Sequence, residues 1–569
     1  MSTALSVRAS SDNLEKNPIE TRSDDTEKAE SACKDDGETP RAGEPPSVDY
    51  PGFRRTLMVM MSAYLSTFLV ALDRTIISTA IPSVTNEFNS LGDIAWYGSS
   101  YLLTFAAFQL LFGKIYQFYS IKYVFLFATV VFEVGSAICG SAPSSNAFIA
   151  GRAIAGFGAS GMFGGSIMLM VSTVPLAKRP VWSAGFGALF GISSVVGPLV
   201  GGAFTSNVTW RWCFYLNLPI GGAVLLAIMV IFKPAQANPE NIHWKEQLRR
   251  LDLSGNVCLI SGVVCLLLAL QWGGTTYAWR NARIIVLLIL FGVLAIAFIV
   301  IQIWKGDLAT VPPRIFKIRS IHAGAFYSAC VGSSMMIMVY YLPVWFQAIK
   351  DASAVKSGIM NIPMLLSLVI ASIMSGIAVR KSGYYTPSMF ACSIVMSIGL
   401  GLVTTFKVDT PHQRWIGYQV VTGFGLGMGM QQAGLAANAV LAKRDISIGV
   451  SLMFFSQTLG GAIFLAIAQS VFTNDMASSL SSVAGVSAST VVNTGATDLR
   501  DVVDPSLLDA VLKAYNHALT RAFIVALSLA AASIFGALRM EWINIKKVDE
   551  KAKDVAGSGS DSSPGKESA

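Results

Sequence analysis

Charged side chains are scarce in this sequence of 569 residues, since Asp, Glu, Lys and Arg together make up 13% of it. A typical soluble domain carries about 25%. Hydrophobic residues make up 53% of the chain, and the mean hydropathy is +0.55. This is more apolar sequence than one soluble core can bury. The composition therefore excludes an ordinary soluble protein and indicates a polytopic membrane protein.

Several chemical signatures are also missing. The sequence holds no Gly-x-x-x-x-Gly-Lys-Ser/Thr phosphate loop, so we do not expect ATP-driven transport by this chain. Its four histidines and seven cysteines show neither metal-ligand spacing nor pairing, so we expect no metal, no cofactor and no enzyme activity. Residues 1–50 hold six basic and twelve acidic side chains, so the net charge of +8 forms no basic tail and no nucleic-acid partner is expected.

Long apolar runs take the place of these features. We count fourteen segments of about twenty residues between Thr56 and Leu538, each long enough to cross a ~30 Å hydrocarbon core. Lys and Arg gather in alternate loops between them, which by the positive-inside rule places both termini in the cytoplasm. These basic clusters include Arg54 and Arg55, Lys178 and Arg179, Arg249 and Arg250, Arg380 and Lys381, and Lys443 and Arg444.

The segments fall into five predicted parts: a disordered cytoplasmic tail at 1–50, a six-helix bundle at 51–235, a linker with two additional transmembrane helices at 236–319, a second six-helix bundle at 320–540, and a disordered tail at 541–569. Short matches at a nearly constant offset support an internal repeat of the two bundles. They pair Ala177-Lys178-Arg179 with Ala442-Lys443-Arg444, Gly156-Phe157-Gly158 with Gly423-Phe424-Gly425, and Gly113 with Gly376.

Charges inside the spans are few, and each is costly in hydrocarbon unless it faces a partner or water. Asp73 and Arg152 lie at a similar depth in the first and fourth spans, so they could face one another and make Asp73 a proton carrier. A purely structural ion pair is the alternative. Glu133 lies near the midplane of the third span, where it is either a proton-coupling group or a protonated packing residue.

Three further features mark candidate sites. Glutamines within the spans are candidates for lining a cavity, namely Gln109, Gln419, Gln431, Gln432 and Gln457. The fifth span carries small residues and a proline on one predicted face, at Gly187, Gly191, Ser194, Pro198 and Gly201, with close helix packing as the simplest interpretation. The candidate positions of this helix are Gly187, Gly191, Gly197, Pro198, Gly201 and Gly202. Asn207-Val208-Thr209 forms a glycosylation sequon in a predicted outer loop.

These motifs together resemble the fourteen-span drug:proton antiporters of the major facilitator superfamily. The resemblance rests on Leu72 to Pro82 (LDRTIISTAIP) in span one, Arg152 to Gly158 (RAIAGFG) in span four and Gly191 to Gly202 in span five. The stretches WYGSSY from Trp96, GKIY from Gly113 and WRWCFYLNLPIG from Trp210 are similar to the fungal branch that exports toxins and other secondary metabolites. In one departure, Gln117 and Ser120 stand where the superfamily usually has Asp and Gly.

The resemblance implies two six-helix bundles that rock about a midplane cavity and exchange protons for an amphipathic small molecule. It also implies that Arg152 helps proton transfer and that Asp73 takes part in coupling or substrate handling. We expect a monomer in the lipid bilayer of the plasma membrane, with an internal membrane such as the vacuole as the alternative. An importer of a nutrient or siderophore on the same scaffold, or a non-transporting receptor, remains open.

Overall fold

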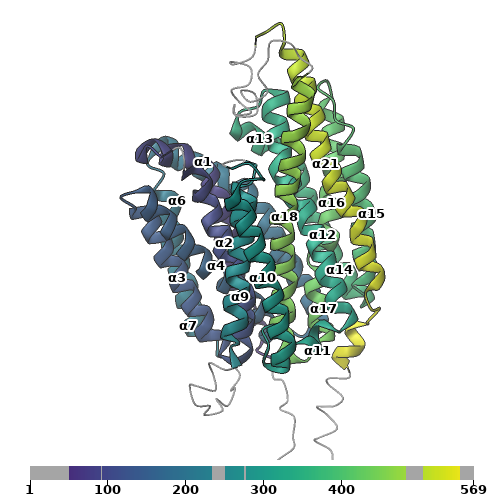
Figure 1. Cartoon of the computed structure of the whole chain (residues 1–569). Coiled ribbons are helices and arrows are strands. Elements are labelled where there is room, and N and C mark those ends of the chain that lie inside the picture. Colours follow the sequence, from purple (N-terminus) through teal and green to yellow (C-terminus); the bar gives the residue numbers. More distant parts are fainter. Residues whose placement is uncertain (1–49, 91–92, 234–249, 275–276, 482–503, 551–569) are drawn as a thin grey trace, which may run out of the picture.

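The computed structural model describes residues 50–90, 93–233, 250–274, 277–481 and 504–550 (Figure 1). Most of the predicted disordered tails, 1–50 and 541–569, lies outside these residues. The described part is built almost entirely of helices, as expected where backbone groups have no water to bond in the bilayer. The prediction of an all-α polytopic membrane protein is confirmed.

The helices form two groups that lie side by side (Figure 1). The first group comprises α1 (Phe53–Phe88), α2 (Ile94–Phe118), α3 (Ile121–Ser141), α4 (Ser145–Thr173), α5 (Arg179–Asn207), α6 (Trp212–Tyr215) and α7 (Asn217–Ile231). The second comprises α12 (Arg319–Lys350), α13 (Ala354–Met360), α14 (Ile362–Ser382), α15 (Thr386–Val403), α16 (His412–Gly429), α17 (Gln432–Val440), α18 (Ile446–Ser481) and α21 (Leu508–Arg539). Between them in the chain come α9 (Leu253–Trp272), α10 (Ala282–Lys305) and the short α11 (Pro313–Phe316).

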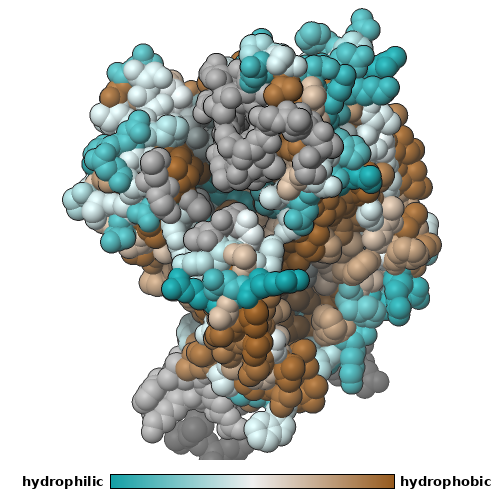
Figure 2. Space-filling model, turned by 45° about the horizontal axis from the view of Figure 1, so that its top comes forward, coloured by the Kyte–Doolittle hydropathy of each residue, from teal (hydrophilic) through white to brown (hydrophobic). Residues whose placement is uncertain are grey.

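Twelve of the described helical segments are long and apolar enough to cross a membrane. The helices at the second and twelfth predicted positions, α2 and α16, are less apolar and do not belong to this set, so the count of fourteen spans stays a prediction. Apolar side chains cover much of the flank of the molecule, whereas hydrophilic residues gather at the end turned toward the viewer in Figure 2. Such a belt fits a surface that faces lipid.

The two groups contact each other mainly through two helix pairs, α5 with α14 and α2 with α18. These pairs occupy equivalent places in the predicted repeat. A Cβ atom placed on Gly376 of α14 would lie 2.7 Å from the Pro180 carbonyl oxygen of α5, and one placed on Gly113 of α2 would lie 2.7 Å from the Ser451 Cβ of α18. The two glycines that the sequence aligns therefore perform the same task, which is to let a helix of the other group approach closely.

The small residues of α5 face two different helices rather than one. A Cβ atom on Gly191 would lie 2.8 Å from the Val369 side chain of α14, in the other group. A Cβ atom on Gly201 would instead lie 2.8 Å from the Ile76 side chain and 3.0 Å from its carbonyl oxygen in α1. Gly187 shares the first contact and Gly197 the second. The α5 helix thus joins α1 to the seam between the groups.

The seam is locked at the end of the bundle where α11 lies, which we call the closed end. Asp445 is buried there, just before α18, and Arg314 of α11 donates to both of its carboxylate oxygens at 2.7 and 2.9 Å. Gln117 of α2 donates to the same carboxylate at 3.0 Å. We call Gln117, Arg314 and Asp445 the Asp445 latch, since it ties the first group, the linker and the second group together.

The two additional helices are anchored by one buried carboxylate. Asp252 caps α9 through the Gly255 amide and accepts hydrogen bonds from Gln302 and Thr310, with Lys305 Nζ 2.8 Å away. Burial by itself would raise the pKa of Asp252, but these bonds hold the pKa below its usual value. The linker is therefore fixed to α9 and α10 at the same end as the Asp445 latch.

The folded part continues beyond residue 540. Ile545 is buried, and its amide donates to the Gly383 carbonyl oxygen at 2.9 Å. Ser320 of α12 donates to the Glu541 carboxylate at 2.7 Å. Residues 541–550, which the sequence analysis assigned to a disordered tail, pack here against the second group because Ile543 and Ile545 supply apolar side chains within a polar stretch.

We predict that G201V destabilises the protein by about 1–3 kcal/mol, because the added side chain must enter a filled contact with α1. The neighbouring G202V is the matched control, since no described atom lies within 4 Å of a Cβ placed on Gly202. The thermal unfolding midpoint of each variant in detergent measures the effect. Equal midpoints for the two variants would contradict the assigned contact.

We predict that D445N loosens the closed end, because each lost hydrogen bond to a charged partner is worth about 1.5–3 kcal/mol. Hydrogen–deuterium exchange at residues 443–451 should become faster than in the unmodified protein. D509N is the control, because the Asp509–Lys513 pair is exposed and contributes little. Unchanged exchange in D445N would show that the latch does not hold this end.

Candidate functional site

The structure brings Asp73 of α1 and Arg152 of α4 into direct contact. Arg152 Nη1 lies 2.5 Å from Asp73 Oδ2, and each side chain is at most 1% exposed. Burying two charges is costly, but removing either one alone leaves an uncompensated charge at a cost of about 3–5 kcal/mol. The pair is therefore stable as a unit and sensitive to any change in the charge of one partner.

Three other residues complete the surroundings of this pair. Arg152 Nε donates to the Tyr97 carbonyl oxygen at 2.9 Å, and its guanidinium lies 4.5 Å from the centre of the Tyr101 ring. Asn217, the first residue of α7, donates to Asp73 Oδ1 at 3.3 Å. The site thus draws on α1, α2, α4 and α7, all within the first group.

Sequence reasoning did not assign roles to these surrounding residues. Tyr97 and Tyr101 stand in the WYGSSY stretch, and Asn217 in the WRWCFYLNLPIG stretch, which were noted only for their resemblance to a family. Asn217 was detectable as the polar residue inside an apolar run. Nothing in the sequence alone showed that its amide faces Asp73.

Glu133 lies close to this site without a hydrogen bond to it. Its side chain fills the space beside Gly221 of α7, and no described residue donates to either of its carboxylate oxygens. One helical turn further along α3, Ser136 accepts a hydrogen bond from Asn217 at 3.1 Å. Glu133 and Asp73 are therefore linked through one face of α3 and the amide of Asn217, rather than by direct contact.

The candidate glutamines do not share one cavity. Gln419 is buried and donates to the Met360 carbonyl oxygen at 3.1 Å, and Gln432 donates to Ser375 at 3.0 Å. Gln109 is buried in α2, and Gln457 packs against Gly332 of α12. Their polarity marks buried positions in the helix bundle, but it did not predict which helix face they occupy.

Gln431 is the candidate glutamine that lines a cavity. This small space lies between the two groups and is bounded by α4 and α5 on one side and by α17 and α18 on the other. Its walls include Phe186, Phe454 and the amide of Asn438. Among the described atoms, neither Gln431 Nε2 nor Asn438 Oδ1 has a hydrogen-bond partner. The cavity therefore offers aromatic surface together with unused polar groups.

The predicted small-residue helix contributes no side chain to the ion pair, but it packs against α1 next to it. Pro198 lies inside α5, five residues after Ser193. The Ser193 carbonyl oxygen accepts a hydrogen bond from the Thr75 hydroxyl of α1 at 2.9 Å. Thr75 follows Asp73 by two residues, so α5 is bonded to α1 beside the site. Asn207 is exposed at the end of α5, and its glycosylation stays a prediction.

The chain matches the family model described as Major Facilitator Superfamily over residues 63–465. It is 52% identical to the MFS-type efflux pump MFS1 of Arthroderma benhamiae, over 86% of this chain and 92% of that protein. It is 48% identical to the rubrofusarin-specific efflux pump aurT of Gibberella zeae, over 87% of this chain and 91% of the relative.

Solved structures with low sequence identity share the fold. The proton:xylose symporter XylE, bound to 6-bromo-6-deoxy-D-glucose, superposes with a TM-score of 0.54 at 14% identity, covering 87% of this chain and 99% of XylE. The family match spans most of the helical region, and the curated relatives match nearly end to end. The family predicted from the motifs is confirmed, and the chain belongs to the Major Facilitator Superfamily of membrane transporters.

Proposed function

We propose that this protein is a secondary active efflux transporter that exchanges protons for an amphipathic small molecule, such as a fungal secondary metabolite, toxin or drug. Export is supported by the two relatives described above, which are named efflux pumps and align with this chain over most of its length. Proton exchange is supported by one observation, the buried pair of Asp73 and Arg152.

The pair provides a two-state element that a proton can bias. When Asp73 takes up a proton, its carboxyl group becomes neutral and Arg152 loses its charged partner. Arg152 keeps the Tyr97 carbonyl oxygen and the rings of Tyr101 and Phe214, which compensate its charge less well. Protonation therefore disfavours the conformation described here and favours one in which Arg152 finds water or another partner.

The packing of α5 supplies a path from this change to the seam. Thr75 binds the Ser193 carbonyl oxygen close to Asp73, and Gly187 and Gly191 of the same helix contact α14. A shift of α1 on protonation therefore moves α5, and α5 moves against the other group. Such rocking of two bundles about a central site is the usual basis of alternating access.

The basic loops suggest which side of the membrane the closed end faces. Lys178, Arg179, Lys443 and Arg444 lie at this end, and Lys and Arg are enriched in cytoplasmic loops. We place the closed end in the cytoplasm, so that the conformation described here is closed toward the inside. We propose that the protein acts as a monomer, because one chain contains both groups and both halves of the seam. We also propose that it resides in the plasma membrane, where an efflux pump can release its substrate outside the cell.

Efflux of preloaded Nile red from yeast cells that lack their own drug pumps tests the function. The protein should accelerate loss of the dye relative to an empty vector, and a protonophore should abolish the difference. Faster uptake in place of faster loss would favour the importer. Efflux that a protonophore leaves unchanged would contradict proton exchange and leave export intact.

We predict that D73N lowers proton-driven transport by roughly tenfold or more, equivalent to a barrier increase of about 1.4 kcal/mol, because the amide cannot carry the proton. Proteoliposomes with an imposed pH gradient measure this rate. Exchange of dye without a gradient, measured on the same preparation, should persist because the substrate site remains.

E133Q is the matched carboxyl-to-amide control for this prediction. Glu133 has no donor among the described residues, so the substitution breaks no ion pair. If D73N retains full gradient dependence while E133Q loses it, Glu133 is the coupling carboxylate and the role proposed for Asp73 is wrong. Loss in D73N alone supports the proposal.

A further inference from the structure

Arg74 is a membrane cation that the proposed mechanism does not use. It follows Asp73 directly but points to a different face of α1, because successive residues are turned by about 100°. Its guanidinium lies 5.6 Å from the centre of the Phe105 ring of α2. Within the described part of the chain, Arg74 makes no ion pair and no hydrogen bond through its side chain. A charge held this way inside a membrane protein marks a functional position.

The surroundings of Arg74 open toward the end opposite the closed end. Ala63, Thr67 and Val70 precede Arg74 on the same face of α1, at helical steps of three and four, and all three are fully buried. Arg74 is half-buried, and Ser78 one turn further on is exposed. The face of α1 that carries Arg74 therefore leaves the packed interior at this residue.

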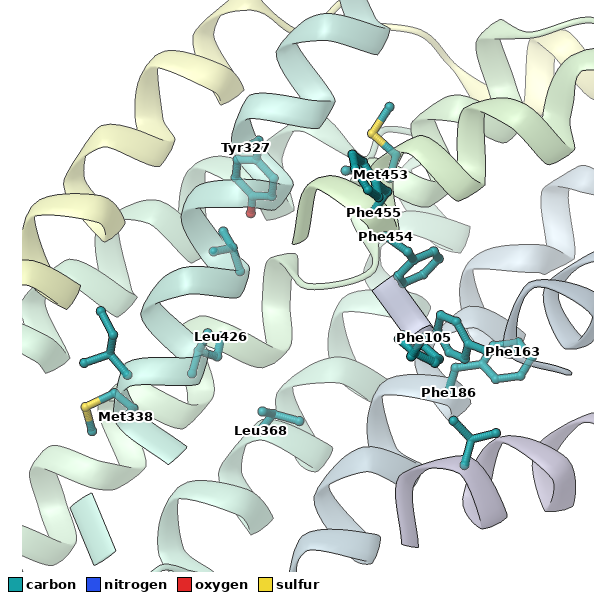
Figure 3. Packing of buried hydrophobic residues seen from close by; sticks show 14 of the residues in the cluster. Phe105, Phe163, Phe186, Tyr327, Met338, Leu368, Leu426, Met453, Phe454 and Phe455 are labelled. Carbon is teal, nitrogen blue, oxygen red and sulfur yellow. The ribbon is translucent and has the colours of Figure 1, made fainter. Parts of the chain in front are cut away.

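An aromatic path leads from Arg74 to the other group. Phe105 stacks in parallel with Tyr101, with ring centres 6.3 Å apart, and lies 6.2 Å from Phe163 of α4. Phe163 meets Phe454 of α18 edge to face at 4.7 Å, across the boundary between the groups. Figure 3 shows Phe105, Phe163 and Phe186 gathered opposite Phe454. A row of aromatic side chains thus connects Arg74 to the cavity that Gln431 lines.

The guanidinium of Arg74 has no anionic partner among the described residues. Asp73 binds Arg152 at 2.5 Å, and Glu133, the other carboxylate near this site, makes no ion pair with Arg74. A guanidinium forms its strongest hydrogen bonds with anionic oxygens such as those of carboxylate or phosphate, and it also stacks on aromatic faces. An ionised phenol offers an anionic oxygen of the same kind. A ligand that brings an anionic oxygen on a planar ring would satisfy the cation and the aromatic side chains together.

We propose that Arg74 binds the acidic group of the transported molecule, and that this transporter takes planar aromatic acids, either carboxylates or ionised phenols. The proposal rests on the proposed export function and specifies its substrate class. The rings from Phe105 to Phe454 are buried against one another in the conformation described here, so the aromatic rings of the substrate would pack against them when the two groups move apart. Gln431 and Asn438 offer polar groups for further oxygen atoms at its far end.

Binding of 2-naphthoate and of its neutral isostere 2-naphthamide to the purified protein tests this assignment, by quenching of tryptophan fluorescence. The unmodified protein should bind 2-naphthoate about tenfold more tightly than 2-naphthamide, and R74Q should remove the preference. R74K should keep part of it, because Lys retains the charge without the planar fork. R283Q is the matched control, since Arg283 also lies over a ring, that of Tyr277, away from this path.

Each outcome decides between the alternatives. Equal binding of both probes by the unmodified protein, or binding of neither, would overturn the substrate class, and a preference that R74Q retains would overturn the role of Arg74. The unfolding midpoint of R74Q shows whether a loss comes from misfolding, in which case R74K carries the test. Nile red efflux reports on the export function separately, because this probe is neutral. The expected pattern is a lost naphthoate preference in R74Q, while R283Q keeps both the preference and normal Nile red efflux.

Discussion

The contact between Asp73 and Arg152 is the constraint around which the first group is arranged. Neither charge is stable alone at a position with at most 1% exposure, so α1 and α4 must keep these two side chains together. The helices that surround the pair contribute a carbonyl oxygen, an aromatic ring and an amide to it. The interior of this group is therefore organised by charge compensation as well as by apolar packing, and a proton is the simplest agent that can disturb it.

Small residues determine how such a disturbance can travel. Inside a membrane the hydrophobic effect does not drive helices together, so close contact depends on small residues that let two backbones approach. The α5 helix meets α1 through Gly197 and Gly201, and meets α14 through Gly187 and Gly191. One helix is thus tightly fitted to the other group through the first half of its length and to α1, beside the charged site, through the second half.

The sequence predicted the fold well because the bilayer allows few structures. Runs of apolar residues must become helices, and internal glycines at repeated positions mark where helices touch, as Gly113 and Gly376 do. It also predicted that Asp73 and Arg152 lie at similar depth. It could not predict that Gln431 lines the cavity while Gln109, Gln419 and Gln457 are packed inside the bundle. A glutamine inside an apolar span indicates burial, but not which helix face carries it. It placed the glycines of α5 on one face, whereas the contacts divide them between two partners.

The closed end shows how a missing residue in one half can be replaced from the other. Gln117 stands where the superfamily usually has an aspartate, which the sequence alone indicates as a lost interaction. In the structure the acid is Asp445, which comes from the second group and lies at the start of α18, where the positive end of the helix dipole favours a carboxylate. Arg314 then brings the linker into the same contact, and Asp252 fixes that linker to α9 and α10. The two additional helices are therefore mechanically connected to the seam, so any movement that opens this end must also displace the linker or break its bond to Asp445.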